Sequence, residues 1–171
     1  MSNQQSSRES VSSQLLSAQE SRAVDAWVRL LRGHAGMRRA VSAQLQSDHE
    51  LTVNEYEALL LLARAQDNHM RRVDLADSLQ LTPSGVTRLL DGLRERGFVD
   101  KATCPGDARV TFAVLADAGQ EKLGEASCSH MAAIKALFEE RYSPPEIETL
   151  IELLGRLPGA GGGCDGSSCT P

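Results

Sequence analysis

Small and hydroxyl-bearing residues with a single cation cluster near the middle of the chain, between Thr82 and Arg88. Thr82 is a typical N-cap and Pro83 suits a first helical position, so a helix is predicted to begin here. Small residues on the outward face of such a helix allow close approach to base edges in the major groove of DNA. The same pattern also fits an ordinary surface helix. The candidate DNA contacts in this segment are Thr82, Ser84, Gly85, Thr87 and Arg88.

A second polar cluster follows about fifteen residues later and contains the turn-forming run Cys104-Pro105-Gly106-Asp107-Ala108. Arg109 comes directly after it, and a cation at a hairpin tip can enter a narrow minor groove, where the negative potential is deepest. Asp107 could hold that arginine by a charged hydrogen bond. The alternative is an exposed charge pair on an ordinary hairpin.

The cysteine and histidine residues offer weaker chemistry. Cys104 beside the turn, and Cys164 with Cys169 near the C-terminus, are possible redox residues. Cys128 and His130 are two residues apart and would face different sides of a helix, so no metal site is predicted. The sequence contains no convincing nucleophile–base pair or phosphate-binding glycine loop. We therefore expect neither an enzyme nor a bound cofactor.

The elements around these residues predict a helix-turn-helix followed by a β-hairpin. Residues 72–79 form a short helix whose inward positions are expected to be Val73, Leu75, Ala76 and Leu79. The next helix, 82–97, has its core face at Val86, Leu89, Leu90 and Leu93 and ends at Gly97. The period then changes to two, which indicates strands at 98–102 and 110–115.

Longer helical patterns flank this unit. They cover about 17–46, then 52–64 with a capping box at Thr52 and Glu55, then 116–141, and finally a helix from the Ser143 signal to Leu157. The predicted fold is mainly α with a small β-hairpin wing: a winged helix-turn-helix plus terminal dimerisation helices. The predicted divisions are a disordered tail (1–16), an N-terminal dimerisation helix (17–50), the DNA-binding lobe (51–116), C-terminal dimerisation helices (117–157) and a flexible Gly/Ser/Cys tail (158–171).

Composition limits the class of protein. The 171 residues carry a net charge of −5, but Arg71–Arg109 holds seven cations and six anions, which leaves the surroundings of the candidate site slightly positive. This balance permits DNA binding without requiring it. A polar N-terminus and short apolar runs predict no secretion signal and no membrane partner, hence a cytoplasmic protein with reduced thiols.

The ordered combination of these motifs resembles the multiple antibiotic resistance regulator (MarR) family over roughly Ala23 to Leu157. The segments that carry the resemblance are Asp74-Leu75-Ala76-Asp77, Thr82 to Val99, Asp107-Ala108-Arg109, and Leu115-Ala116-Asp117-Ala118-Gly119. Ala116 stands where the family usually has threonine, so we expect the helix cap to come from Asp117. The resemblance implies that Ser84, Thr87 and Arg88 face the major groove and Arg109 the minor groove of double-stranded DNA, with an inverted repeat as the binding site of a homodimer.

The resemblance also implies a repressor that a small-molecule or stress signal releases from DNA. Family members often bind a small anionic aromatic effector between the dimer helices and the DNA-binding lobe. The residue types such a pocket would use here are Trp27, His34, Arg38 and Tyr56. Two alternatives stay open: a cysteine-based redox-sensing regulator, and a winged helix that docks on protein.

Overall fold

A computed structural model describes residues 22–104 and 107–159; of Cys104 and residues 107–109 it describes the backbone alone. The chain divides into two compact units, one ending at Ala40 and one beginning at Val41.

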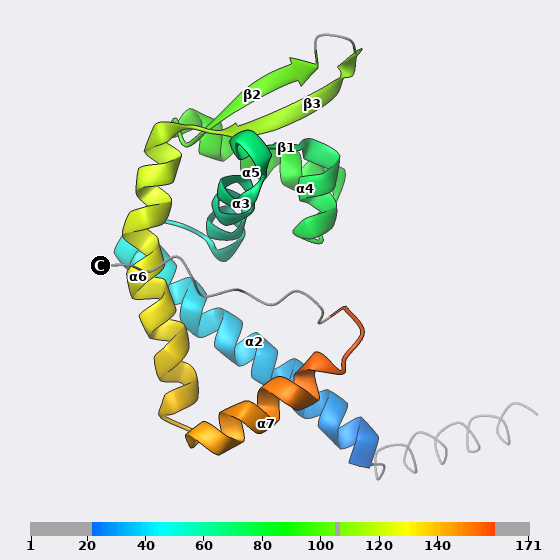
Figure 1. Cartoon of the computed structure of the whole chain (residues 1–171), viewed down its shortest axis with the longest axis vertical. Coiled ribbons are helices and arrows are strands. Elements are labelled where there is room, and N and C mark those ends of the chain that lie inside the picture. Colours follow the sequence, from blue (N-terminus) through cyan, green and yellow to red (C-terminus); the bar gives the residue numbers. More distant parts are fainter. Residues whose placement is uncertain (1–21, 105–106, 160–171) are drawn as a thin grey trace, which may run out of the picture. The chain divides into compact units, whose positions relative to one another are not determined.

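Six α-helices and a small sheet make up the described residues (Figure 1). The helices are α2 (Arg22–His49), α3 (Val53–Arg64), α4 (Arg72–Ser78), α5 (Pro83–Glu95), α6 (Asp117–Glu139) and α7 (Pro144–Gly155), with a 3-10 turn η1 (Gln66–Asn68). The strands are β1 (His69–Arg71), β2 (Val99–Cys104) and β3 (Asp107–Leu115). The mainly helical architecture with a hairpin confirms the predicted fold class.

The sheet is antiparallel with the order β1-β3-β2, so β3 lies in the middle. Val99 pairs with Leu115 and Lys101 with Ala113, and the register shifts between Thr103 and Cys104. Figure 1 shows the β2–β3 hairpin extending beyond α5. This is the wing that the change of period predicted, and both of its strands are longer than expected.

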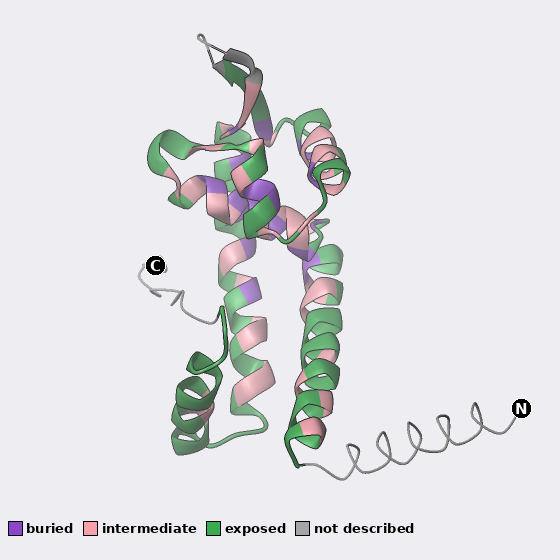
Figure 2. Ribbon diagram, turned by 90° about the vertical axis from the view of Figure 1, so that its right-hand side faces the viewer, coloured by how far each residue is buried: buried purple, intermediate pink, exposed green. Residues whose placement is uncertain are grey.

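The hydrophobic core belongs to the lobe formed by α3, α4, α5, the sheet and the first half of α6 (Figure 2). The residues Leu59, Leu62, Leu75 and Leu93 have no solvent exposure at all. Leu89 and Leu90 are partly buried and pack against the same cluster. The inward stripe predicted for the helix after Thr82 is therefore confirmed.

The predicted helix ends are also present. Thr52 and Glu55 form a complete capping box at the start of α3. Gly97 adopts a left-handed backbone with φ of 75°, and Phe98 N–H donates to the Leu93 carbonyl at 2.9 Å. This pairing closes the end of α5 in the manner of a Schellman motif, for which glycine is favoured.

Three local predictions need correction. Val73 is 65% exposed, because it lies in the first turn of the short α4 and points to solvent, whereas Leu75 and Ala76 supply the buried face. The residues His69–Arg71, for which the sequence analysis predicts no element, form a strand through pairing with β3. Ala116, not Asp117, is the N-cap of α6, and it makes no side-chain capping bond.

Gly119 fixes the junction between the sheet and α6. A Cβ at this position would lie 2.1 Å from the Phe98 carbonyl oxygen and 2.9 Å from Leu115 Cδ1. The same carbonyl accepts a hydrogen bond from Ala116 N–H at 3.1 Å. A side chain at position 119 would therefore push α6 away from the end of α5.

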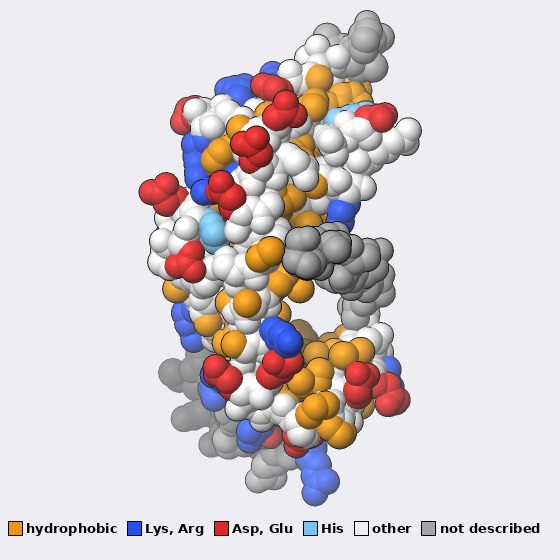
Figure 3. Space-filling view, turned by 60° about the vertical axis from the view of Figure 1, so that its left-hand side comes forward, with side chains coloured by type: hydrophobic (Ala, Val, Ile, Leu, Met, Phe, Trp, Pro, Cys, Tyr) orange, Lys and Arg blue, Asp and Glu red, His pale blue; other side chains and the backbone are white. Residues whose placement is uncertain are grey.

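The last helix differs from the lobe in its exposure. None of the residues of α7 is buried, and its exposed apolar side chains include Ile151, Leu153 and Leu154. Hydrophobic side chains gather in the lower part of the view, where α7 lies (Figure 3). None of the helices in the described part of the chain is long and apolar enough to cross a membrane.

Candidate nucleic-acid interface

The start of α5 is built as the sequence predicts. Thr82 has an extended backbone, and its Oγ1 accepts a hydrogen bond from Gly85 N–H at 3.1 Å. Pro83 occupies the first turn, where its missing N–H costs nothing. The remaining N–H groups of this turn and the positive end of the helix dipole favour a phosphate group nearby.

The outward face of α5 carries the predicted contact residues. Ser84 and Arg88 are exposed, and Thr87 is half-buried. Thr87 Oγ1 donates to the Pro83 carbonyl at 2.7 Å, so its oxygen can only accept further hydrogen bonds. The structure thus brings together a hydroxyl acceptor and an exposed guanidinium on one side of the helix.

The cations of α5 differ in their partners. Arg94 pairs with Asp91 at 3.1 Å, one turn apart. The Arg88 side chain, in contrast, has no ion pair or hydrogen bond with any residue that the structure describes. A role for Arg88 as the partner of Asp91 or Asp77 is therefore not seen, and its guanidinium is available to a ligand.

A tight turn sets the angle between α4 and α5. Gln80 has a left-handed backbone with φ of 54°. Leu81 N–H then donates to the Ala76 carbonyl at 2.9 Å, which holds the end of α4 against the start of α5. The packing of Leu75 against Val86 in one core adds to this, so the exposed face of α5 is carried on a rigid support.

The wing positions the two predicted tip residues in the backbone of β3, directly after the turn. Asp107 begins that strand and lies opposite Cys104. The side chains of Asp107 and Arg109 lie outside the described part, so their contacts with a groove stay predictions.

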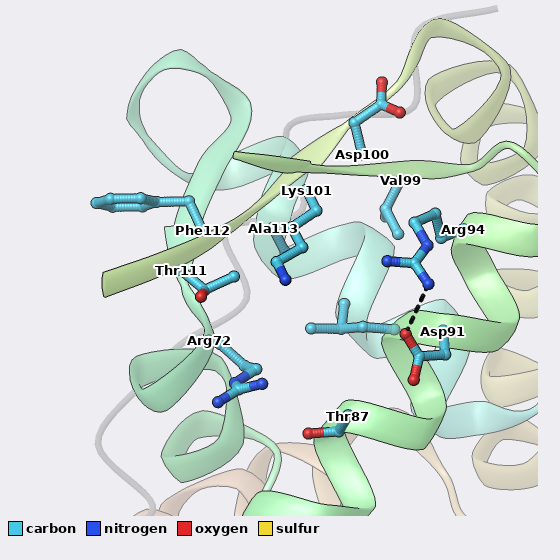
Figure 4. A pocket seen from close by; sticks show the side chains of 11 residues that line it. Arg72, Thr87, Asp91, Arg94, Val99, Asp100, Lys101, Thr111, Phe112 and Ala113 are labelled. Carbon is cyan, nitrogen blue, oxygen red and sulfur yellow. Dashed lines mark ion pairs between the residues drawn. The ribbon is translucent and has the colours of Figure 1, made fainter. Parts of the chain in front are cut away.

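A cavity of about 340 Å³ lies between α5 and the wing strands (Figure 4). Sequence reasoning missed it, because the residues come from four separate elements. The charged and hydroxyl-bearing residues at its lining are Arg72, Thr87, Asp91, Arg94, Asp100, Lys101 and Thr111. In Figure 4 the Lys101 amine and the Arg72 guanidinium point into this space, whereas the Asp100 carboxylate turns away.

A buried polar network lies on the other side of α3. His130 is 5% exposed, its ring centroid lies 4.5 Å from that of Tyr56, and its Nδ1 lies 3.2 Å from Gln44 Oε1. Because that oxygen can only accept, Nδ1 carries the hydrogen. His49 Nε2 lies 2.6 Å from Ser129 Oγ. Burial, and secondarily the charge of His49, lowers the pKa of His130 below its usual value.

The other predicted sites are not assembled by the described residues. Tyr56 is buried in the lobe, whereas Trp27, His34 and Arg38 are exposed on α2 in the other unit, so their grouping in an effector pocket stays a prediction. Cys164 and Cys169 lie outside the described residues, as does the Cys104 side chain. Within residues 22–104 and 107–159, no three metal-binding side chains come together.

A short helix, a tight turn, a second helix with an exposed polar start and a hairpin wing together define a winged helix-turn-helix protein. Residues 49–110 match the sequence profile of the MarR family. Sco3205 from Streptomyces coelicolor, a MarR family transcriptional regulator solved in complex with DNA, has the same fold with a TM-score of 0.69 and 26% identity, over 75% of this chain and 80% of that one. In the profile of residues 49–110 and in its fold, the chain is similar to the MarR family of transcriptional regulators.

Other relatives agree with this assignment. The transcriptional repressor YetL of Bacillus subtilis is 31% identical over 107 residues, which span 63% of this chain and 64% of the repressor. AbsC, another MarR family regulator from Streptomyces coelicolor, superposes with a TM-score of 0.63 at 27% identity, over 73% of this chain and 86% of its own. This chain therefore matches less than two thirds of the length of YetL.

Proposed function

We propose that the protein is a dimeric transcription regulator that binds an inverted repeat in double-stranded DNA. The N-terminal half of α5 enters the major groove, and the wing reaches the neighbouring minor groove. The regulator acts as a repressor, and a small-molecule or stress signal releases it from DNA.

The observation that carries this proposal is the exposed Arg88, which has no partner among the described residues and lies beside Ser84 and Thr87 at the start of a well-supported helix. Arginine reads guanine through two parallel hydrogen bonds, which requires a guanidinium that is not already engaged. The similarity to Sco3205, a regulator solved in complex with DNA, supports DNA binding by this chain.

The test compares two arginines of α5. Duplexes that the protein enriches from a random library supply an operator, and a shuffled duplex serves as the reference. Arg88→Ala is expected to lower the operator-to-shuffled affinity ratio by roughly 1–3 kcal/mol, because a base contact is lost. Arg94→Ala is the matched control, since Arg94 is held by Asp91 near the other end of the helix. A folded wild type that binds no duplex would contradict DNA binding and favour a protein-docking role.

The dimer is proposed because the apolar face of α7 is uncovered within its own unit. Ile151, Leu153 and Leu154 are exposed, and two-fold pairing of such a face in a second copy would remove it from water. Sedimentation at micromolar concentration is expected to give twice the chain mass of 18.4 kDa. A species of the single-chain mass throughout would contradict this.

The releasing signal is proposed to be a small anionic aromatic compound that binds near Tyr56. Tyr56 OH lies 3.3 Å from Ser127 Oγ, which in turn donates to the Leu123 carbonyl, so a polar path leads from α3 into α6. A library of aromatic carboxylates, scored by release of the operator, tests this. Release by wild type but not by Tyr56→Phe or Tyr56→Leu supports the site, and equal release by all three proteins contradicts it.

A further inference from the structure

The cavity between α5 and the wing contains two cationic side chains that make no ion pair with a described residue. Arg72 begins α4 and Lys101 lies in the middle of β2, and both side chains line the cavity. Neither side chain has an ion pair or hydrogen bond with a residue in the described part of the chain. The other cation of the cavity, Arg94, is paired with Asp91.

The neighbouring Arg71, in contrast, is paired with a carboxylate of the same lobe. Its guanidinium binds both oxygens of Asp74, at 2.7 and 2.9 Å. That hydrogen bond and the charge of Asp74 raise the pKa of Arg71. One of two adjacent arginines is thus engaged with a carboxylate, and the other is left with its charge directed into the cavity.

The strand register explains why the cation at position 101 enters the cavity and the anion beside it does not. Lys101 pairs with Ala113, and Val99, on the same face of β2, is buried against the lobe. Asp100 lies on the opposite face because side chains alternate along a strand. Figure 4 shows its carboxylate turned away from the space that Lys101 enters.

Thr87 links this cavity to the predicted reading face of α5, because it belongs to both. Its hydroxyl hydrogen is committed to the Pro83 carbonyl, so Thr87 offers no hydrogen bond to an anion. Thr111, on β3, lines the other side, and its hydroxyl makes no hydrogen bond with a described residue. Two cations and one hydroxyl donor therefore surround an opening beside the surface that would face DNA.

We propose that Arg72 and Lys101 together hold one backbone phosphate of the bound duplex, in the cavity between the recognition helix α5 and the wing. This inference rests on the proposed DNA binding. It adds an anchor that carries no sequence information but fixes the wing and α5 to the same strand. A phosphodiester suits the site because its two unesterified oxygens share one negative charge, which a guanidinium and an ammonium can contact together.

The test uses a 24-base-pair duplex of arbitrary sequence, because phosphate contacts do not depend on sequence. Affinity is measured against salt concentration for wild type, Arg72→Gln, Lys101→Gln and the double variant. Losing one neutralised phosphate is expected to reduce the magnitude of the logarithmic salt slope by about 0.9 for each lobe on the DNA. The double variant shows this reduction, and the ratio of operator to arbitrary-duplex affinity stays at the wild-type value.

The matched controls are Arg71→Gln and Lys135→Gln, which remove cations already paired with Asp74 and Glu139. Both controls are expected to keep the wild-type salt slope. If wild type binds the duplex and the double variant keeps the full slope, the phosphate site is wrong and DNA binding stands. If wild type binds no duplex, the proposed function itself fails.

A second arm distinguishes the duplex from a free anion. Inorganic phosphate and sodium chloride are compared at equal ionic strength for their effect on the melting temperature. We expect no difference between the two salts, because the cavity is open and only the duplex holds its phosphate in register. A shift with phosphate that the double variant abolishes, together with an unchanged salt slope on DNA, would assign the cavity to a free oxyanion and overturn the proposal.

Discussion

The helix α7 differs from the lobe that runs from α3 to the start of α6 in the burial of its apolar side chains. In the lobe, leucines from α3, α4 and α5 meet in one cluster with no solvent exposure. In α7, no residue is buried, although the helix has a complete capping box at Ser143 and Glu146. A helix can thus be specified locally without a partner in its own unit, whereas the lobe closes its own core.

The largest expected effect comes from opening the core of the lobe. Leu93→Ala removes a fully buried side chain, and we expect a loss of about 2–5 kcal/mol in the free energy of unfolding. Denaturant unfolding measures it, with Leu153→Ala on the exposed face of α7 as the control. The comparison predicts that the loss from Leu93→Ala does not depend on protein concentration, since the core lies within one chain. Equal losses for both variants would remove the distinction between the regions.

The second effect belongs to α7. Ile151→Asp places a charge on the proposed contact surface and is expected to weaken the dimer at least tenfold, about 1.4 kcal/mol. Sedimentation against concentration measures the dissociation constant, and the circular dichroism of the lobe should not change. Thr149→Asp, which adds the same charge at another exposed position of α7, is the control for added acidity. A dimer of unchanged strength would place the interface elsewhere.

The third effect concerns the wing. Arg109→Ala is expected to weaken operator binding by roughly 1–3 kcal/mol, because a cation at the hairpin tip meets the minor groove. Fluorescence anisotropy with the operator duplex measures it, and an unchanged melting temperature shows that the core is intact. Binding with unchanged affinity and salt slope would show that the wing does not touch DNA.

The smallest effect is expected from the polar network behind α3. His130 is neutral in the folded state because its pKa is lowered, so the unfolded chain binds a proton more readily. Stability from this residue is present above the unfolded pKa of about 6.5 and is lost as the pH falls below it. We expect the melting temperature to fall between pH 7.5 and 5.5.

The control for this prediction is His130→Gln, which should make the profile flatter, while His34→Gln on the exposed face of α2 should keep the wild-type slope. His49, Asp48 and Tyr56 also face this region, so the profile of His49→Gln is measured in parallel. A profile of equal slope in wild type and His130→Gln would show that another group carries the pH dependence.

The sequence predicted the features that depend on contacts between nearby residues, and it did not predict those that depend on distant contacts. The caps at Thr52 and Thr82 and the stop at Gly97 depend on neighbours within a few residues, and all three are present. Strand β1 was missed because His69–Arg71 has no strand pattern of its own and exists only by pairing with β3. Caps and stops can therefore be predicted from neighbouring residues, whereas a three-residue strand that depends on a distant partner cannot.

The candidate site shows the same limit. The reading face of α5 follows from helical periodicity, which places Ser84 and Arg88 opposite the core stripe. The pairing of Arg94 with Asp91 and the freedom of Arg88 could not be read from spacing, because either arginine has Asp91 within one turn. The cavity of Arg72 and Lys101 depends on which face of β2 turns toward α5, and this is set by the register with β3.

Because Gly119 has no side chain, one end of α6 packs closely against the Phe98 carbonyl, and a tilt at this contact moves the far end of the helix. A helix of 23 residues is about 34 Å long at 1.5 Å per residue. Held at one end against the Phe98 carbonyl, such a rod converts a tilt of about 5° into a displacement of about 3 Å at its far end, close to the 3.4 Å rise of one base pair. In the proposed dimer, a change of angle at this contact would change the distance between the two α5 helices by about one base-pair step.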